Sequence, residues 1–434
     1  MLTKDAISQI LISQKENLLL KESGLKREAL QTLPDLSAYA MIVSGIRRCG
    51  KSTLLFQLLK ERYPDALYLN FEDPRLYEFE INDFVKLDEV IRENQNKVLL
   101  FDEIQIIDQW ERYVRQKLDE GYKLVITGSN ASLLSRELGT KLTGRHITKE
   151  LFPFSFREFN LFNQLEASPD SLSQYLHTGG FPEYVKQHAN EILNYIFEDI
   201  LIRDIAVRYG IRDVKTLQRL ALYLISNVGK QITANRLKSM FEVGSTNTIT
   251  EYLSHLEGSY LLQFIAKFDY SLRKQMVNPR KVYAIDTGMV SVNSGSFTED
   301  SGRLLENLVY LHLRRTYRDI YYFSEKYECD FVVFEKDTIQ EVVQVCFNLN
   351  ADNLNRELNG VMEALTFFNK KEGKIITFRQ KDRFEKEGRV IDVIPCHEFL
   401  QGVFQKVCQD SSTDDVLSDG AGLYSKAPQN IMRQ

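Results

Sequence analysis

The apolar positions of residues 37–160 fall into short runs that alternate with amphipathic stretches. Residues 39–45, 66–73, 97–103 and 122–130 are apolar along most of their length, whereas the stretches between them carry apolar side chains at helical spacing. Strands without a polar face that alternate with helices are typical of a parallel sheet covered on both sides. The pattern therefore predicts an α/β fold with such a sheet in this part of the chain.

The rest of the chain divides into four further segments. Residues 1–36 show helical spacing, and residues 161–278 are mostly helical until a short helix, a turn at Gly244, a second helix and a β-rich return. That order is typical of a winged helix-turn-helix. Residues 279–408 mix strands with helices, which predicts a separate α/β domain. Residues 409–434 are polar and rich in Ser, Asp and Gly, so we expect a disordered tail.

Composition narrows the class of protein. The chain has 434 residues, which favours two or three domains, and no apolar run is long enough to span a bilayer. Residues 1–20 mix charges with apolar side chains, so we expect an amphipathic helix and not a signal peptide. The five cysteines form no CxxC pair and no pattern with the histidines. We therefore predict neither a zinc site nor disulfides, and a cytoplasmic location.

Positive charge is concentrated in residues 201–281. This stretch holds 13 Lys and Arg against 6 Asp and Glu, although the whole chain has a net charge of −5. The overall charge argues against a generally basic coat for nucleic acid. A basic stretch within an acidic chain would contact either nucleic acid or an acidic neighbouring domain, and the sequence leaves both open.

Residues 45–52, with the sequence GIRRCGKS, match the phosphate-binding pattern GxxxxGK[S/T] between a predicted strand and a predicted helix. The glycines allow backbone N–H groups to approach phosphates, and the positive end of the following helix points at them. Lys51 would reach the β- and γ-phosphates, and Ser52 would bind Mg²⁺. The ATP-binding set predicted from this loop is Gly45, Ile46, Arg47, Arg48, Cys49, Gly50, Lys51, Ser52 and Thr53.

A second set of polar residues follows two later strands. Asp102 and Glu103 end the apolar run 97–103. Asp102 would bind Mg²⁺ together with Ser52, and Glu103 would take a proton from the attacking water. Ser129 and Asn130 end the next strand, where they would position water or contact the γ-phosphate. The sequence thus predicts hydrolysis of ATP in addition to binding.

Hydrolysis of this kind also uses an arginine that stabilises charge in the transition state. The candidates are Arg136, Arg145 and Arg203, each of which has an alternative role in a surface ion pair. A neighbouring subunit often supplies this arginine, so a homo-oligomer is compatible with the sequence.

Several stretches then reveal a family resemblance. They are SGIRRCGKSTLL, LFDEIQ, VITGSNASLLSRELGTKLTGR, LFPFSFREF, TGGFPEYV and ILIRDIA, followed by VYAIDTGMV, GRLLENLVYLHL and YECDFVVF. In this order they resemble the uncharacterised AAA+-type ATPases of bacteria and archaea that carry a C-terminal restriction-endonuclease-like domain. The resemblance covers about residues 15–405. It implies an ATPase core at 37–160, a helical and winged-helix middle at 161–278, and a nuclease-like domain at 279–408.

The resemblance also implies roles for individual residues. Gly45, Gly50, Lys51, Ser52, Asp102 and Glu103 match the positions that carry ATP chemistry in that family. Gln105 matches the last residue of the DEIQ motif and Arg145 that of the GR motif, without a defined role for either. The family itself does not indicate a substrate.

The third domain departs from the nuclease pattern. Such nucleases hold Mg²⁺ with an acidic residue on one strand and a Glu-x-Lys on the next, often assisted by a helical glutamate. Glu306 and Asp330 lie where the family pattern expects acidic residues, but Gln344 and Cys346 occupy the Glu and Lys positions. A neutral amide is a poor ligand for Mg²⁺ and a thiol cannot replace an ammonium. Glu341 would face the other side of the strand. We expect a domain that keeps the fold and has lost hydrolysis.

The sequence of the middle segment predicts only weak recognition of DNA by its second helix. The second helix of the predicted helix-turn-helix begins at Ser245 with polar residues but carries no Lys or Arg, and it includes Glu251 and Glu257. Basic residues on either side would supply phosphate contacts. They are Arg236, Lys238, Arg273, Lys274, Arg280 and Lys281.

These observations lead to one main hypothesis and two alternatives. The main one is a cytoplasmic AAA+-like ATPase whose turnover drives a conformational change in the winged-helix and nuclease-like domains, acting on DNA, RNA or protein. The first alternative is an ATP-controlled nuclease, which Gln344 and Cys346 oppose. The second is a slow nucleotide switch in a signalling or defence assembly.

Overall fold

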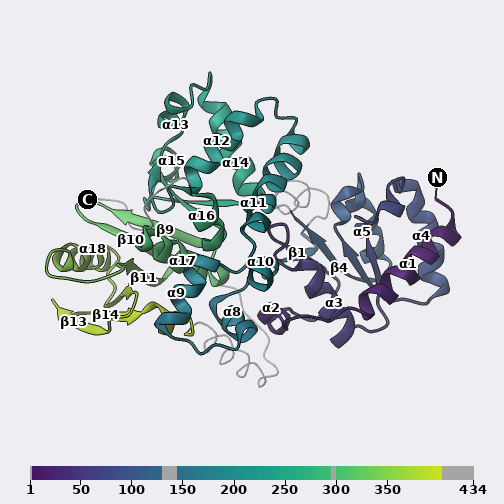
Figure 1. Cartoon of the computed structure of the whole chain (residues 1–434), viewed down its shortest axis with the longest axis horizontal. Helices are drawn as coiled ribbons and strands as arrows, with labels where there is room; N and C mark the ends of the chain where they lie inside the picture. The colour runs from purple at the N-terminus through teal and green to yellow at the C-terminus, as the bar shows by residue number, and fades with distance from the viewer. Residues whose placement is uncertain (1, 130–143, 295–299, 403–434) are drawn as a thin grey trace, which may run out of the picture.

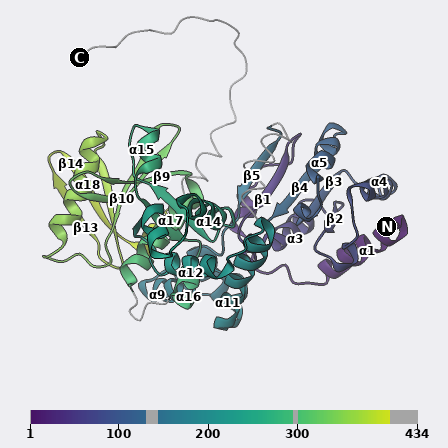
Figure 2. The ribbon, with the colours of Figure 1, turned by 90° about the horizontal axis from the view of Figure 1, so that it is seen from above.

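The computed structural model describes residues 2–129, 144–294 and 300–402. Figure 1 shows the N-terminal elements at one end of the molecule and the C-terminal sheet at the other, with a helical middle between them. The perpendicular view in Figure 2 shows the same separation. Along these described ranges, no helix is both long and apolar enough to cross a membrane.

The N-terminal unit is built on a five-stranded sheet with the order β2-β3-β4-β1-β5, in which every neighbouring pair is parallel. This confirms the α/β fold class predicted from the apolar runs. The strands are β1 (Ala40–Ser44), β2 (Leu67–Asn70), β3 (Val98–Asp102), β4 (Lys123–Gly128) and β5 (His146–Glu150).

Helices cover both faces of this sheet because successive strand residues point to opposite sides. Met41 and Val43 of β1 belong to the core formed with α3, whereas Ala40 and Ile42 belong to the core formed with α1, α4 and α5. A strand buried on both faces must be apolar throughout, which explains the runs in the sequence. The helices are α1 (Lys4–Leu19), α2 (Glu28–Thr32), α3 (Lys51–Glu61), α4 (Phe84–Glu93) and α5 (Trp110–Asp119), with 3₁₀ turns η1 (Pro74–Leu76), η2 (Ile81–Asp83) and η3 (Ile104–Ile106).

The middle of the chain is helical. A π-helical segment, η4 (Ile200–Val207), continues α11. It contacts the N-terminal unit through Asp204, which accepts a hydrogen bond from Arg47. Segments with π-helical bonding are rare and are often found at functional sites. The other helices of this part are α8 (Phe156–Asn163), α9 (Pro169–Thr178), α10 (Pro182–Gln187), α11 (Asn190–Asp199) and α12 (Val214–Ile225).

A small antiparallel sheet follows, with the order β6-β8-β7. From α12 the chain runs helix, strand, helix, helix, strand, helix, strand, which contains the short helix, turn, second helix and β-rich return predicted from the sequence. β8 follows the predicted domain boundary at residue 278 but pairs with both earlier strands; the boundary itself stays a prediction. The elements are β6 (Gln231–Ile232), α13 (Ala234–Met240), α14 (Thr246–Gly258), β7 (Leu262–Ala266), α15 (Leu272–Val277) and β8 (Arg280–Ala284).

The C-terminal unit contains a mixed six-stranded sheet with the order β13-β14-β12-β11-β10-β9. β9, β10 and β11 are antiparallel, and β12 adds parallel to β11 after the crossover helix α18. Its assignment as restriction-endonuclease-like stays a prediction. The elements are α16 (Thr287–Asn293), α17 (Ser301–Thr316), β9 (Asp319–Ser324), β10 (Glu328–Glu335), β11 (Thr338–Val345), α18 (Leu354–Phe367), β12 (Glu372–Thr377), β13 (Asp382–Lys386), β14 (Arg389–Pro395) and α19 (Cys396–Phe399).

Candidate functional site

The loop between β1 and α3 adopts a backbone that requires glycine at two places. Gly45 has φ 154°, and a Cβ added there would lie 2.1 Å from the carbonyl oxygen of Leu151. Gly50 has φ 101°, and its Cβ would lie 2.8 Å from the Arg27 guanidinium. Because α3 begins directly after Gly50, its first N–H groups face the space that the loop encloses. The loop is therefore shaped as an anion cradle at a helix N-terminus.

Lys51 is folded into this loop. Its side chain is 4% exposed, and its Nζ donates to the carbonyl oxygens of Gly45 and Ile46, each at 3.2 Å. The same Nζ lies 3.5 Å from Glu103 Oε1. Burial alone would lower the pKa of Lys51, but the carboxylates of Glu103 and Asp102 outweigh it, so the pKa is raised and the ammonium stays charged.

Asp102 ends β3 and is fully buried beside hydroxyl groups. Its carboxylate accepts hydrogen bonds from Thr127 and from Tyr68, the latter at 3.0 Å. The Ser52 hydroxyl also hydrogen-bonds to it. Burial, followed by the charge of Glu103, raises the pKa of Asp102, although these hydroxyl groups oppose the rise. A cation beside this carboxylate would stabilise its charged form.

Glu103 follows Asp102 in a left-handed backbone conformation, with φ 51°. Its N–H donates to Thr127 Oγ1 at 2.9 Å, which fixes the turn at the end of the strand. The side-chain amide of Gln105 donates to the Glu103 carboxylate. Glu103 therefore lies between the Lys51 ammonium and the Gln105 amide, at the edge of the sheet where the phosphate loop opens.

A cavity of about 600 Å³ lies between these strand ends and η4. Ser129, which the sequence placed in the site, lines this cavity and is buried. Ligands of open parallel sheets bind at the carboxyl ends of the strands, and this cavity occupies that edge. The polar residues that line it include Arg47, Glu72, Glu103, Ser129, Arg203 and Asp204.

Arg47 connects the phosphate loop to η4, a contact that no local sequence pattern indicated. Its guanidinium donates to both carboxylate oxygens of Asp204, at 3.1 and 3.2 Å, and lies 3.6 Å from Glu72. Burial would lower the pKa of Arg47, but Asp204 and then Glu72 raise it. Bidentate contacts of this kind fix both partners in orientation.

Four further residues of the predicted ATP-binding set differ in burial and in their contacts. Ile46 and Cys49 are fully buried in the core, and burial raises the pKa of the Cys49 thiol, so it is not a reactive group. Arg48 has φ 63° and pairs with Glu183 at 2.5 Å on the surface. Thr53 is half-buried at the start of α3.

The arginine candidates do not gather in one place. Arg145 lies just before β5, at the amino edge of the sheet, where it pairs with exposed Asp119. It does not reach the phosphate loop of its own chain, so a role toward a neighbouring subunit stays a prediction. Arg203 lines the cavity from η4. Asn130 and Arg136 lie outside the described residues, as do residues 409–434.

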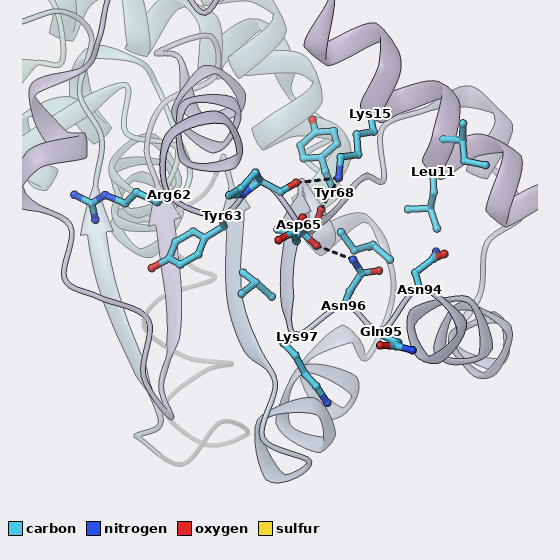
Figure 3. Close-up of a pocket in the computed structure, with 15 residues that line it drawn as sticks. Leu11, Lys15, Arg62, Tyr63, Asp65, Tyr68, Asn94, Gln95, Asn96 and Lys97 are labelled. Carbon is cyan, nitrogen blue, oxygen red and sulfur yellow. Dashed lines mark hydrogen bonds between the residues drawn. The ribbon is translucent and has the colours of Figure 1, made fainter.

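A larger cavity, of about 770 Å³, lies at the opposite edge of the sheet (Figure 3). Two of its polar groups donate to backbone carbonyls: Lys15 Nζ donates to Pro64, and the Asn96 amide donates to Asp65. It is open beside the amino ends of β2 and β3, although the hydroxyl of Tyr68, which also lines it, donates to Asp102. The chemistry favours the smaller cavity as the nucleotide site.

The donor set of the phosphate loop and the end of β3, beside the smaller cavity, fits ATP with Mg²⁺. The loop backbone and Lys51 supply N–H donors and positive charge for phosphates, and Ser52 with Asp102 supplies the oxygen ligands that Mg²⁺ prefers.

In the C-terminal unit, the structure brings together the residues that the sequence singled out. Glu306 lies on α17, Asp330 on β10 and Gln344 on β11, and the Asp330 N–H donates to Gln344 Oε1 at 3.0 Å. Glu341 instead pairs with Lys374 at 2.5 Å. Among the described residues, no group of His, Cys, Asp and Glu has an arrangement that would hold a metal ion.

Taken together, the loop, Lys51 and the Asp102–Glu103 pair on a five-stranded parallel sheet define a P-loop nucleotide-binding protein. Residues 37–160 match the model of an AAA domain, and residues 169–300 match a domain of unknown function.

Two relatives match most of the chain. An uncharacterised protein of Methanocaldococcus jannaschii is 33% identical over 389 residues, covering 82% of this chain and 86% of the relative. An uncharacterised protein of Haemophilus influenzae is 33% identical over 337 residues, covering 72% and 83%. The chain belongs to the family of AAA-domain P-loop ATPases that includes these archaeal and bacterial proteins, which confirms the family resemblance for the ATPase part.

Solved structures add little to this. AMPPCP-bound DnaA from Aquifex aeolicus matches with 14% identity and a TM-score of 0.28, over 53% of this chain and 85% of that chain. The Thermotoga maritima RuvB Holliday junction branch migration motor matches with 17% identity and a TM-score of 0.28, over 57% and 87%. Scores of this size support no argument about substrate or partner.

Proposed function

We propose that this chain is a cytoplasmic ATPase that binds ATP with Mg²⁺ at the 45–52 loop and hydrolyses it. The observation that supports this best is the convergence of Lys51, Asp102 and Glu103 at one edge of the sheet. Lys51 and the loop N–H groups would hold the phosphates, and Ser52 with Asp102 would hold the metal. When bound, Mg²⁺ supplies positive charge against the phosphate oxygens.

Glu103 would then take a proton from the attacking water. Its carboxylate contacts the Lys51 ammonium and accepts a hydrogen bond from the Gln105 amide. A phosphate in the loop would compete for the Lys51 ammonium and release one of these two restraints. Glu103 is therefore proposed as the general base, and Gln105 as the residue that orients it.

The lysine provides the first test. Replacing Lys51 with alanine is expected to weaken ATP binding roughly 10- to 100-fold, because hydrogen bonds to a charged group contribute about 1.5–3 kcal/mol. Titration with a fluorescent ATP analogue in Mg²⁺ measures this. Lys60→Ala changes an exposed lysine on the same helix and serves as the control. Unchanged affinity in Lys51→Ala, matching the control, would place the nucleotide elsewhere.

We further propose that nucleotide binding is transmitted to the middle of the chain through Arg47 and Asp204. Asp204 engages the guanidinium of Arg47 from η4, while Arg47 belongs to the loop that would hold the phosphates. An added phosphate charge would compete with Asp204 for Arg47. The π-helical bonding of η4 is of a kind often found at functional sites. A weakened contact would therefore move η4 relative to the sheet.

Replacing Asp204 with asparagine is expected to reduce this response. In the wild type, hydrogen exchange of residues 190–225 should differ between the nucleotide-free protein and its complex with Mg²⁺ and a non-hydrolysable ATP analogue. The variant should lose most of that difference while binding the analogue within about threefold of wild type. Glu183→Gln, which removes the partner of Arg48, is the control. An intact difference in Asp204→Asn would show that the signal takes another path.

The partner that receives this change is proposed to be nucleic acid or another protein. The exposed basic residues Arg236, Arg273, Lys274 and Arg280 support phosphate contacts by the middle of the chain. Lys281, which the sequence grouped with them, is 2% exposed and cannot take part, so that expectation is wrong for Lys281. A homo-oligomer, in which Arg145 would act on a neighbouring site, also remains part of this proposal.

A further inference from the structure

Lys281 lies at the centre of a carboxylate cluster. It is the second residue of β8, and its side chain is 2% exposed. Its Nζ lies 2.7 Å from Asp330 Oδ1, 2.8 Å from Glu328 Oε1 and 3.1 Å from Glu306 Oε1. These carboxylates belong to α17 and β10 of the C-terminal unit, whereas the lysine belongs to the three-stranded sheet of the middle. We call Glu306, Glu328 and Asp330 the carboxylate socket.

Each carboxylate of the socket also accepts a hydrogen bond from another residue. Tyr283 OH donates to Glu306 Oε1 at 2.7 Å, and the Gln231 amide donates to Glu328 Oε2 at 2.9 Å. Asp330 Oδ2 accepts from the N–H of Val345 at 2.9 Å. On the side of β6, Gly229 comes so close that an added Cβ would lie 2.9 Å from Glu306 Oε2. Two strands of the small sheet therefore close the socket.

The geometry of the socket suits an ammonium and not a divalent metal. Asp330 and Glu328 lie 2.7 and 2.8 Å from Nζ, within the range of about 2.7–2.9 Å for charge-assisted hydrogen bonds, and Glu306 lies at 3.1 Å. The ammonium occupies the space between the carboxylates, so Lys281 would have to leave before Mg²⁺ could bind there with oxygens at about 2.0–2.1 Å. Gln344 adds no charge, and its amide donates away from the socket to Glu357 at 2.7 Å. Gln344 thus links the backbone of Asp330 to Glu357 and contributes no negative charge that would bind a metal ion.

We propose that Lys281 is the permanent cation of the carboxylate socket, in the position where a metal-dependent nuclease-like domain would hold Mg²⁺. The acidic residues Glu306 and Asp330 are then explained without catalysis: they receive a lysine from the middle of the same chain. The socket makes the C-terminal unit independent of divalent cations and fastens it to the three-stranded sheet. This assignment does not depend on ATP binding or hydrolysis.

The socket should respond to pH when the lysine is removed. Burial and then the charge of Asp330 raise the pKa of Glu306 to about 7, although Lys281 and Tyr283 oppose the rise. A carboxyl group with a raised folded pKa contributes stability at low pH that is lost as the pH rises through that value. Without the ammonium, nothing balances the charges of Glu306, Glu328 and Asp330 above pH 7.

The first experiment compares Lys281→Met with Lys274→Met by thermal unfolding of the full chain at pH 8 and pH 5.5. Lys274 is 70% exposed and has one surface partner, Asp269, so its variant should match wild type at both values. Lys281→Met should lose several degrees at pH 8 and much less at pH 5.5, because removal of one partner leaves buried charges uncompensated. An equal midpoint for the two variants at pH 8 would overturn the proposal.

The second experiment does not require Lys281→Met to fold. Mn²⁺ binding to the nucleotide-free protein is counted by electron paramagnetic resonance for wild type, Glu306→Gln and Asp330→Asn. If Lys281 is the resident cation, all three bind the same number of ions, and EDTA does not shift their unfolding midpoints. A Mn²⁺ ion that wild type binds and either variant loses would show that the socket holds a metal, and the proposal would fail.

Discussion

Replacing Glu103 with glutamine is expected to lower ATP turnover by about 100-fold or more while leaving nucleotide affinity nearly unchanged, since a positioned general base typically contributes 10²–10⁴-fold. The substitution keeps the size of the side chain and its hydrogen bond to Gln105 within reach, but it removes the group that accepts the proton. Lys51 would also lose its nearest carboxylate, 3.5 Å away, which leaves it freer to bind phosphate. Steady-state phosphate release and analogue binding, measured on the same preparations, separate the two effects.

Glu61→Gln is the matched control for that measurement. Glu61 ends α3 and pairs with Lys26 on the surface, where its side chain is 38% exposed. Its variant should keep turnover within about threefold of wild type, as expected for a surface substitution. If Glu103→Gln retained wild-type turnover, the proton would have to go to another group, and the proposed role of Glu103 would be wrong.

The parallel sheet could be predicted from the sequence because its physical cause is local. A strand that packs against helices on both faces has no polar face, so Met41 and Ile42 are both apolar although they point in opposite directions. The phosphate loop was readable for a similar reason. Its glycines are fixed by backbone approach, as at Gly45 beside Leu151, and its lysine and serine by the chemistry of phosphate and Mg²⁺.

Contacts between distant parts of the chain could not be predicted in this way. Arg47 and Asp204 are 157 positions apart, and neither stretch carries a pattern that points to the other. The sequence placed Arg47 in the phosphate loop but indicated nothing about its contact with η4. The π-helical bonding of residues 200–207 likewise depends on packing and not on a local propensity.

The partners of Lys281 could not be predicted either, and here the prediction from the sequence was wrong. Its basic neighbours along the chain made it a candidate for phosphate contacts, yet its partners Glu306, Glu328 and Asp330 come from later elements and bury it. The substitutions at Gln344 and Cys346 were visible in the sequence and indicated that a metal site had been lost. The ion pairs of Lys281 with these carboxylates could be seen only once β8, α17 and β10 were placed together.

Arg27 also makes contacts that no local pattern indicated, because it lies in a segment that the sequence predicted only to be helical. It is 2% exposed, and its guanidinium donates to the carbonyl oxygens of Cys49 and Phe152, each at 2.7 Å, and to Glu158 Oε1 at 2.8 Å. One side chain thus ties the N-terminal segment to the phosphate loop and to the stretch that leads into α8. Burial would raise the pKa of Glu158, but Arg27 outweighs it, so the pKa is lowered and the pair stays charged.

Replacing Arg27 with methionine is therefore expected to lower the free energy of unfolding by about 3–5 kcal/mol, the usual cost of removing one partner from a buried ion pair. The carboxylate of Glu158 and the carbonyl of Cys49 would lose charged donors in a buried environment. Because Cys49 precedes Gly50, the phosphate loop should also become less ordered, and ATP affinity should fall with stability. Urea unfolding followed by circular dichroism measures the first effect, and analogue titration the second.

Lys26→Met gives the comparison for this prediction, since Lys26 is the preceding residue and pairs with Glu61 on the surface, where the two side chains are 54% and 38% exposed. Its loss should cost less than about 1 kcal/mol, as is usual for exposed ion pairs. The same urea midpoint in Arg27→Met and Lys26→Met would mean that the buried pair does not stabilise the fold. A lower midpoint with unchanged ATP affinity would instead limit Arg27 to the fold, because the loop would then keep its shape without the contact to Cys49.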